Sequence, residues 1–310
     1  MLLMNVCNPW SEIALPTPAL WATVSLDSRR VQILEIWLKR ARNYPLDIAF
    51  NGLYSGASIV VGQYAKQLKH LGIRGTYLLI DCSTDLGCLP RLETLKIDNI
   101  IMPEGDCPDF RRTQVIGIFD DTTETLVPPH LRCLRLDANV ILDYVLLPTL
   151  QTLAFPLQNA SATSALSRFL QRSRPPLQKL ILKLSSSFPT LLECVRLVPL
   201  LTDLELDGRR ESRGPEDLFF ALADSSSQLL PHLRTLIIRD HYLNPSESSY
   251  QTVIRTLSVR RGQLVSFRLM AHHFSSEPPI DVCARLRQMV ADGMDIYVGS
   301  YRRNFISESG

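Results

Sequence analysis

A short pattern of apolar positions recurs along this chain. The pattern is P-x-L-x-x-L-x-[L/I/F], and it occurs six times. The copies span residues 90–97, 129–136, 148–155, 175–182, 199–206 and 231–238. Within each copy the last two apolar positions alternate with period two, which is typical of a strand with one buried face. Proline cannot donate a hydrogen bond inside a sheet, so each proline should lie just before a strand.

The spacing of the copies predicts a repeat architecture. Their prolines are 39, 19, 27, 24 and 32 residues apart, a mean of about 28, near the upper end of the period of leucine-rich repeats. Two further segments match the apolar positions without the proline. They are Leu68, Leu71 and Ile73 upstream, and Leu264, Phe267 and Leu269 downstream. About eight units therefore fill most of the chain.

Segments with helical spacing lie between the expected strands. Their apolar residues recur at i, i+3 and i+4, as on one face of a helix. These residues are Leu34, Trp37 and Leu38; Leu166, Phe169 and Leu170; Leu218, Phe219 and Leu222; and Val253, Ile254 and Leu257. Two of the expected helices end in nearly the same six residues, Trp37-Leu-Lys-Arg-Ala-Arg42 and Phe169-Leu-Gln-Arg-Ser-Arg174. Cations are favoured in the last helical turn by the helix dipole.

These elements predict an α/β fold, a curved leucine-rich-repeat solenoid of about eight irregular strand and helix units. Residues 27–300 form the expected solenoid, which ends in a helix over 280–291, a stop at Gly293 and a strand over 295–298. The tail, 301–310, is expected to be flexible. Residues 1–26 do not fit the repeat pattern.

Residues 1–26, here called the N-terminal segment, carry two of the three tryptophans. The segment resembles the C-terminal half of an F-box, with the phrases V-C-x-x-W-x-x-I-A and P-x-L-W. The matching positions are Val6, Cys7, Trp10, Ile13, Ala14, Pro18, Leu20 and Trp21. With the repeats, nearly the whole chain is similar to F-box proteins with irregular leucine-rich repeats from mushroom-forming fungi. The first helix of a full F-box would precede Val6, so the resemblance covers a module truncated at its N-terminal half.

The resemblance implies a substrate receptor of an SCF-type ubiquitin ligase. In such a receptor the N-terminal segment binds the Skp adaptor of a cullin-RING ligase and the solenoid binds an unknown target protein. The implied adaptor contacts are Val6, Trp10, Ile13, Ala14, Leu20 and Trp21. Pro9 departs from the family pattern and predicts a helix that begins here, with Asn8 as its N-cap. In the alternative, the N-terminal segment only covers the first repeat and the chain is a stand-alone scaffold without a ligase role.

The target would meet the side chains between the buried strand positions, on the expected concave face. We expect this face to present Lys96, Asp98, Arg135, Asp137, Lys179, Lys183, Asp203, Glu205, Asp207, Arg239 and Arg268. Lys179 and Lys183 should lie beside Asp203, Glu205 and Asp207 in the next strand. Such cross-strand pairs contribute about 0.2–1 kcal/mol each. Mutual neutralisation on a solvated face is the simpler interpretation of the same charges.

Composition narrows the remaining possibilities. The formal charge is only +2 and no charged tail is present, which argues against nucleic-acid and anionic-membrane partners. Seven scattered cysteines without a C-x-x-C pair favour a reduced compartment, cytoplasmic or nuclear. The sequence holds none of the common hydrolase, nucleotide or zinc motifs, so we expect no enzyme activity, no cofactor and no metal. His130 and His232 occupy the same slot of a repeated Pro-His-Leu-Arg phrase, which indicates a structural role.

Overall fold

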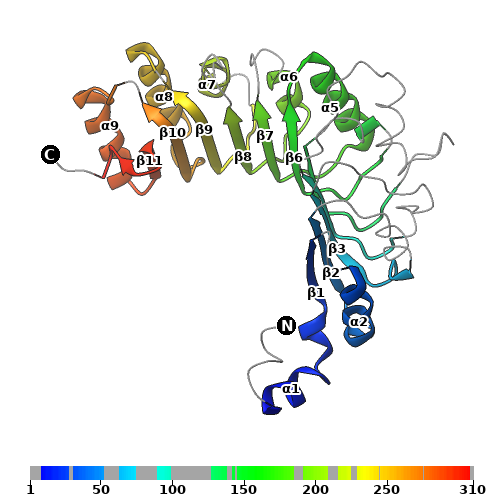
Figure 1. The fold of residues 1–310 in the computed structure, drawn as a ribbon. Coiled ribbons are helices and arrows are strands. Elements are labelled where there is room, and N and C mark those ends of the chain that lie inside the picture. Colours follow the sequence, from blue (N-terminus) through cyan, green and yellow to red (C-terminus); the bar gives the residue numbers. More distant parts are fainter. Residues whose placement is uncertain are drawn as a thin grey trace, which may run out of the picture. The chain divides into compact units, whose positions relative to one another are not determined.

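The computed structural model describes residues 8–27, 31–51, 63–74, 89–98, 127–137, 142–143, 145–184, 191–208, 216–224, 229–243, 245–274 and 276–307. The fold is α/β (Figure 1), with twelve strands and seven α-helices in those residues. The chain divides into two compact units, Met1–Thr149 and Leu150–Gly310. The sequence did not predict this division, because the repeat pattern runs through it.

The first unit begins with the N-terminal segment. Helix α1 spans Asn8–Ala14, and the 3-10 helix η2 spans Pro18–Trp21 with its proline in the first turn. Helix α2 (Val31–Ala41) is the other helix described in this unit. Its strands are β1 (Thr23–Asp27), β2 (Leu46–Asn51), β3 (Leu68–Arg74), β4 (Thr94–Asp98) and β5 (Cys133–Leu136). They pair in sequence order, and every pair is parallel.

The second unit alternates strands and helices without exception as far as β11. The strands are β6 (Thr152–Leu157), β7 (Lys179–Leu184), β8 (Asp203–Gly208), β9 (Thr235–Leu243), β10 (Ser266–Phe274) and β11 (Asp295–Ser300). The helices are α5 (Ala160–Ser173), α6 (Leu191–Arg196), α7 (Glu216–Ala223), α8 (Glu247–Val259) and α9 (Ile280–Ala291). In Figure 1 these helices follow one another along one side of the strands. Neighbouring strands are parallel from β6 to β11.

The apolar positions of the repeated pattern stack into two continuous ladders in the second unit. One ladder joins Leu153, Leu180, Leu204, Leu236, Phe267 and Ile296. The other joins Phe155, Leu182, Leu206, Ile238, Leu269 and Val298. All twelve side chains are buried. The predicted strand register is therefore confirmed, since a slip of one residue would have turned every one of these side chains to solvent.

The backbone before each strand repeats as well. The carbonyl oxygen of Gln178 accepts the amide N–H groups of both Thr202 and Asp203, at 2.8 and 2.9 Å. The Thr202 carbonyl accepts from Arg234 and Thr235 in the same way, and the Arg234 carbonyl accepts from Val265 and Ser266. In the first unit the Glu93 carbonyl does so for Arg132 and Cys133. One local geometry thus recurs at the same position of the pattern in both units.

The helical stripes expected from the sequence form the other side of the core. Phe169 and Leu170 are buried on α5, and Leu257 is buried on α8. Two helices have side-chain caps: Asn159 accepts from the Ala162 amide at α5, and Ser246 accepts from the Ser249 amide at α8. The repeated helix-ending phrase also repeats its backbone. Its last residues, Arg42 and Arg174, both have positive φ, at 51° and 42°.

The end of the chain differs from the expected flexible tail. Helix α9 and the stop at Gly293, with φ 98°, agree with the sequence. Strand β12 (Arg303–Asn304) then turns back and pairs antiparallel with the end of β11, and Ile306 is buried. Gly299 makes this close approach possible, because a Cβ there would overlap the Arg303 carbonyl. Residues 301–307 therefore pack on the last parallel strand.

Candidate functional site

Polar side chains gather on one face of the strands in the second unit, here called the polar strand face. The register places Lys179 opposite Asp203, and Lys183 opposite Asp207. Asp207 in turn lies opposite Arg239 on β9. The residues of this face that the sequence predicted are Lys179, Lys183, Asp203, Glu205, Asp207, Arg239 and Arg268. All seven side chains are exposed or half-buried, in contrast to the leucines between them.

The polar strand face also has apolar members that charge patterns do not reveal. One row across the strands reads Ile181, Glu205, Ile237, Arg268 and Tyr297. Ile181, Ile237 and Tyr297 are half-buried and lie on the same side of their strands as the charged residues. A mixture of aliphatic, aromatic and charged side chains is typical of protein-binding surfaces.

Ion pairs between neighbouring strands organise charges of this face. Arg239 donates to Glu205 on the preceding strand, and Arg268 donates to Asp295 on the following strand at 3.1 Å. Ser266 also donates to Asp295, at 2.8 Å. The Ser266 hydroxyl, followed by Arg268, holds the pKa of Asp295 below its ordinary value, although burial acts in the opposite direction. Glu205 and Arg239 form an ion pair between neighbouring strands, in which Glu205 is the more buried partner.

The predicted residues of the first unit occupy equivalent positions on β4 and β5. Lys96 lies opposite Arg135, and Arg135 donates to Asp98 at 3.1 Å. Asp137 follows β5, and its amide donates to the Ile97 carbonyl. These four charges lie within Met1–Thr149 and the other seven within Leu150–Gly310, so the predicted face is divided between the two compact units.

The N-terminal segment packs through one tryptophan. Trp21 is only 5% exposed, and its indole Nε1 donates to the Ala14 carbonyl at 2.7 Å. Its ring meets Trp37 of α2 edge to face at a centroid distance of 5.2 Å. The Arg40 guanidinium lies over the same ring at 4.6 Å. Trp21 and Ala14 therefore join the N-terminal segment to the first helix of the repeats.

Two other residues expected to bind the adaptor are directed to solvent. Ile13 is 64% exposed and Leu20 is 47% exposed, although each neighbours a buried residue, Ala14 and Trp21. Helix α1 begins within one residue of the expected start at Pro9. Val6 lies outside the described residues, as does the side chain of Trp10.

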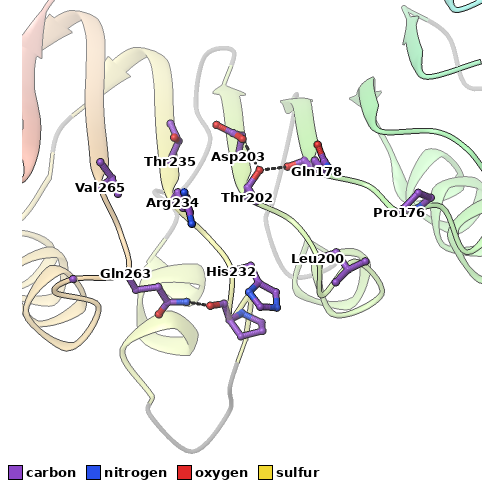
Figure 2. A pocket seen from close by; sticks show the side chains of 12 residues that line it. Pro176, Gln178, Leu200, Thr202, Asp203, His232, Arg234, Thr235, Gln263 and Val265 are labelled. Carbon is purple, nitrogen blue, oxygen red and sulfur yellow. Dashed lines mark hydrogen bonds between the residues drawn. The ribbon is translucent and has the colours of Figure 1, made fainter.

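A groove that the sequence did not predict crosses the starts of β7 to β10, here called the strand-end groove. Its volume is about 1080 Å³. Figure 2 shows that its lining comes from the turns before four neighbouring strands. It is lined by Pro176, Gln178, Leu200, Thr202, Asp203, Pro231, His232, Arg234, Thr235, Gly262, Gln263 and Val265.

The lining of the strand-end groove follows the repeat. Gln178, Thr202, Arg234 and Val265 all occupy the position just before the start of their strands, and the carbonyls of the first three form the repeated backbone bonds. Thr202 donates toward the Gln178 carbonyl at 3.0 Å and toward the Asp203 carboxylate at 2.6 Å. His232 belongs to the Pro-His-Leu-Arg phrase, and its side chain is exposed in this groove. In the sequence, the only sign of this groove is the polar residue that stands just before the strand in several copies of the pattern, such as Gln178, Thr202 and Arg234.

The described residues contain no cluster of His, Cys, Asp or Glu suited to a metal ion. In the described part of the chain, Cys133, Cys194 and Cys283 are not joined in disulfides. Burial raises the pKa of the Cys194 thiol despite a hydrogen bond with Ser167, and burial also raises the pKa of Cys283. Both shifts favour the unreactive thiol form.

Comparison with known proteins gives no assignment. No protein-family model matches the chain, and a search of curated proteins finds no match. In the described residues, no helix is both long and apolar enough to cross a membrane. The class defined by the fold is therefore an α/β protein with stacked parallel strands, and its function must be inferred from its surfaces.

Proposed function

We propose that this chain is a non-catalytic protein-interaction module, built as a leucine-rich-repeat-like solenoid. The observation that carries the proposal is the polar strand face. Its residues come from alternate positions on successive strands and combine ion pairs with half-buried Ile181, Ile237 and Tyr297. A rigid sheet holds them at a spacing of about 4.8 Å from strand to strand. Such a surface binds a folded partner through many side chains at once.

We propose further that the module is a substrate receptor of an SCF-type ubiquitin ligase in the cytoplasm or nucleus. The N-terminal segment then binds the Skp adaptor and the polar strand face binds the target. The exposure of Ile13 and Leu20 supports this role, since aliphatic side chains of that size gain from being covered by a partner. Trp21 would hold the N-terminal segment on the repeats rather than contact the adaptor.

The alternative of a stand-alone scaffold has its own supporting observation. Trp21 is hydrogen-bonded within the N-terminal segment and packs on Trp37, so it already covers the first repeat helix. A segment of this kind is useful to the fold even without an adaptor. The two functions differ in a single respect, which is whether Ile13 and Leu20 are covered in the cell.

Affinity capture with three forms of the protein distinguishes these roles. One form is unchanged, one carries Glu205→Lys with Asp207→Lys on the polar strand face, and one carries Ile13→Ser with Leu20→Ser in the N-terminal segment. We expect the face variant to keep a Skp adaptor and lose another protein, and the N-terminal variant to lose only the adaptor. Loss of neither protein in the face variant would contradict the target-binding role of that face.

The substitutions are chosen to leave the fold intact. Ile13 and Leu20 are exposed, and changes at such positions alter stability by about 0.5 kcal/mol or less. Glu205 and Asp207 are half-buried, and Glu205→Lys breaks the ion pair with Arg239, so we expect the face variant to lose about 1 kcal/mol and remain folded. Thermal unfolding of each variant provides the check. If none of the three folded forms captures the adaptor, the scaffold role is the correct one. Capture of the adaptor by the N-terminal variant as strongly as by the unchanged protein would show that Ile13 and Leu20 are not the adaptor contacts.

A further inference from the structure

A second hollow adjoins the strand-end groove. It has a volume of about 460 Å³ and lies where α5 and α6 end. Leu200 lines both hollows, and the successive prolines Pro175 and Pro176 line one each. Leu200 is 52% exposed, so it forms an apolar point between the two. Together they make one continuous surface within the unit Leu150–Gly310.

Three arginines line this surface, and they leave it with an excess of positive charge. Arg174 and Arg196 line the smaller hollow, and Arg234 lines the strand-end groove. In the part of the chain that the structure describes, none of the three side chains has a carboxylate partner. The one acidic residue of the lining, Asp203, accepts a hydrogen bond from Thr202. Each arginine therefore has donors suited to a carboxylate.

The backbone of the groove cannot bind an extended chain by adding a strand. The carbonyls of Gln178, Thr202 and Arg234 each accept two amide groups from the next repeat. An occupant must therefore be recognised by side chains. The lining offers three guanidinium groups against one carboxylate, Asp203, together with apolar groups such as Leu200 and the proline rings. Neutral polar side chains such as Gln178 and His232 complete it. The balance favours an occupant with negative charge and an apolar residue.

The dimensions of the groove favour an extended peptide. It crosses four strands, and three inter-strand steps of about 4.8 Å cover about 14 Å, the length of about four extended residues. Pockets for small molecules are usually enclosed, with few polar groups. This groove takes polar side chains from several of the strands that it crosses (Figure 2).

We propose that this surface binds a short, extended, acidic peptide segment of another protein. The carboxylates of the segment meet Arg174, Arg196 and Arg234, and an apolar side chain packs on Leu200 between the two hollows. The proposal goes beyond the proposed function, because Arg174, Arg196, Arg234 and Leu200 belong neither to the N-terminal segment nor to the polar strand face, and only Asp203 is shared with that face. It assigns the protein a second binding surface with its own chemistry.

The chain supplies a matched control for the test. Arg132 and Arg234 end the two copies of the Pro-His-Leu-Arg phrase, and both side chains are exposed. Only Arg234 lies in the groove. Binding is measured by fluorescence anisotropy with a labelled octapeptide of aspartate and glutamate that has two central leucines. We expect Arg234→Glu to weaken binding at least about tenfold, whereas Arg132→Glu changes it by less than about twofold.

Two further variants test each half of the recognition. Arg196→Glu should weaken binding of the acidic peptide about as much as Arg234→Glu. Leu200→Ser, which adds no charge, should weaken it by removing the apolar contact. A peptide with serine in place of the leucines should bind more weakly, and one with lysine in place of the acids should not bind. Circular dichroism and thermal unfolding confirm that each variant is folded.

Three results would each overturn the proposal. One is absence of binding between the unchanged protein and the acidic peptide at low salt, where charge attraction is strongest. Another is an equal effect of Arg132→Glu and Arg234→Glu, which would indicate a general charge effect. The third is equal binding of the lysine and acidic peptides. None of these results affects the adaptor experiment, so the two proposals fail separately.

Discussion

The repeat strands and the N-terminal segment bury their apolar side chains to very different degrees. On β6 to β11 the two apolar ladders are buried without exception. In the N-terminal segment Ala14 and Trp21 are buried, at 3% and 5% exposure, as are Ala22, Val24 and Leu26 at its end, while Ile13 and Leu20 remain exposed. The strands bury these apolar side chains against other parts of the same chain. Ala14, Trp21, Ile13 and Leu20 all belong to the F-box-like pattern, and only Ala14 and Trp21 of these four are buried.

This difference separates two reasons for an apolar residue to be present. Leu204 is needed by the fold, because it fills a ladder between Leu180 and Leu236. Leu20 contributes little to the fold, since about half of its surface remains in water. Exposed apolar residues beside a well-packed tryptophan are therefore the part of the N-terminal segment that is available for a partner.

The largest effect on stability is expected from Trp21→Ala. The change removes an indole that is hydrogen-bonded to Ala14 and packed on Trp37, and it should cost about 3–5 kcal/mol. Leu20→Ala is the matched control and should change the free energy of unfolding by less than about 0.5 kcal/mol. Urea unfolding measures both. Similar values for the two variants would show that the N-terminal segment does not depend on Trp21.

A slightly smaller effect is expected at the repeat positions. Leu204 is 1% exposed, and Leu204→Ala should lower the free energy of unfolding by about 2–5 kcal/mol. Leu134 in the first unit has the same burial and the same place in the pattern, so Leu134→Ala should fall in the same range. Lys179→Ala, on the other face of a neighbouring strand, is the control. A loss below about 0.5 kcal/mol at Leu204, on the order of a surface change, would contradict the register.

The smallest effect on stability is expected at Tyr250, which is buried in the core although its side chain carries a polar hydroxyl group. Its hydroxyl is buried without a hydrogen-bond partner in the described residues. Tyr250→Phe should therefore leave stability unchanged or raise it by up to about 1 kcal/mol. Burial raises the pKa of Tyr250 from 10.0 to about 12. The unchanged protein should thus lose stability as the pH rises from about 10 toward 12, because the unfolded chain releases this proton first.

The Phe variant should lack that part of the pH dependence, which urea unfolding at a series of pH values can measure. A loss of more than about 1 kcal/mol in Tyr250→Phe at neutral pH would show that the hydroxyl has a partner.

The sequence was sufficient for features that depend on neighbours along the chain. Alternation predicted the buried face of the strands from β4 to β10, and helical spacing predicted stripes such as Phe169 and Leu170. Helix α9 has the expected bounds, and Gly293 ends it with a positive φ, a conformation that glycine adopts at little cost. Each of these features is determined by the residue types at a few neighbouring positions of the sequence.

Features that depend on several strands together could not be derived in this way. The strand-end groove exists because Gln178, Thr202, Arg234 and Val265 come together through the register of four strands. The pairing of β12 with β11 depends on the close approach of Arg303 to Gly299, and no apolar pattern in the sequence indicates that contact. Exposure of Ile13 and Leu20 likewise depends on how α1 and η2 pack, which spacing alone leaves open.

The most direct measurement of the proposed function is size-exclusion chromatography of the purified chain mixed with a Skp adaptor. Ile13→Ser with Leu20→Ser tests the N-terminal segment, and Ile280→Ser is the matched control, since Ile280 is 87% exposed on helix α9 of the second unit. We expect the unchanged protein and the control to elute with the adaptor, and the N-terminal variant to elute alone. Separate elution of the folded, unchanged protein would contradict the receptor role and leave the scaffold role.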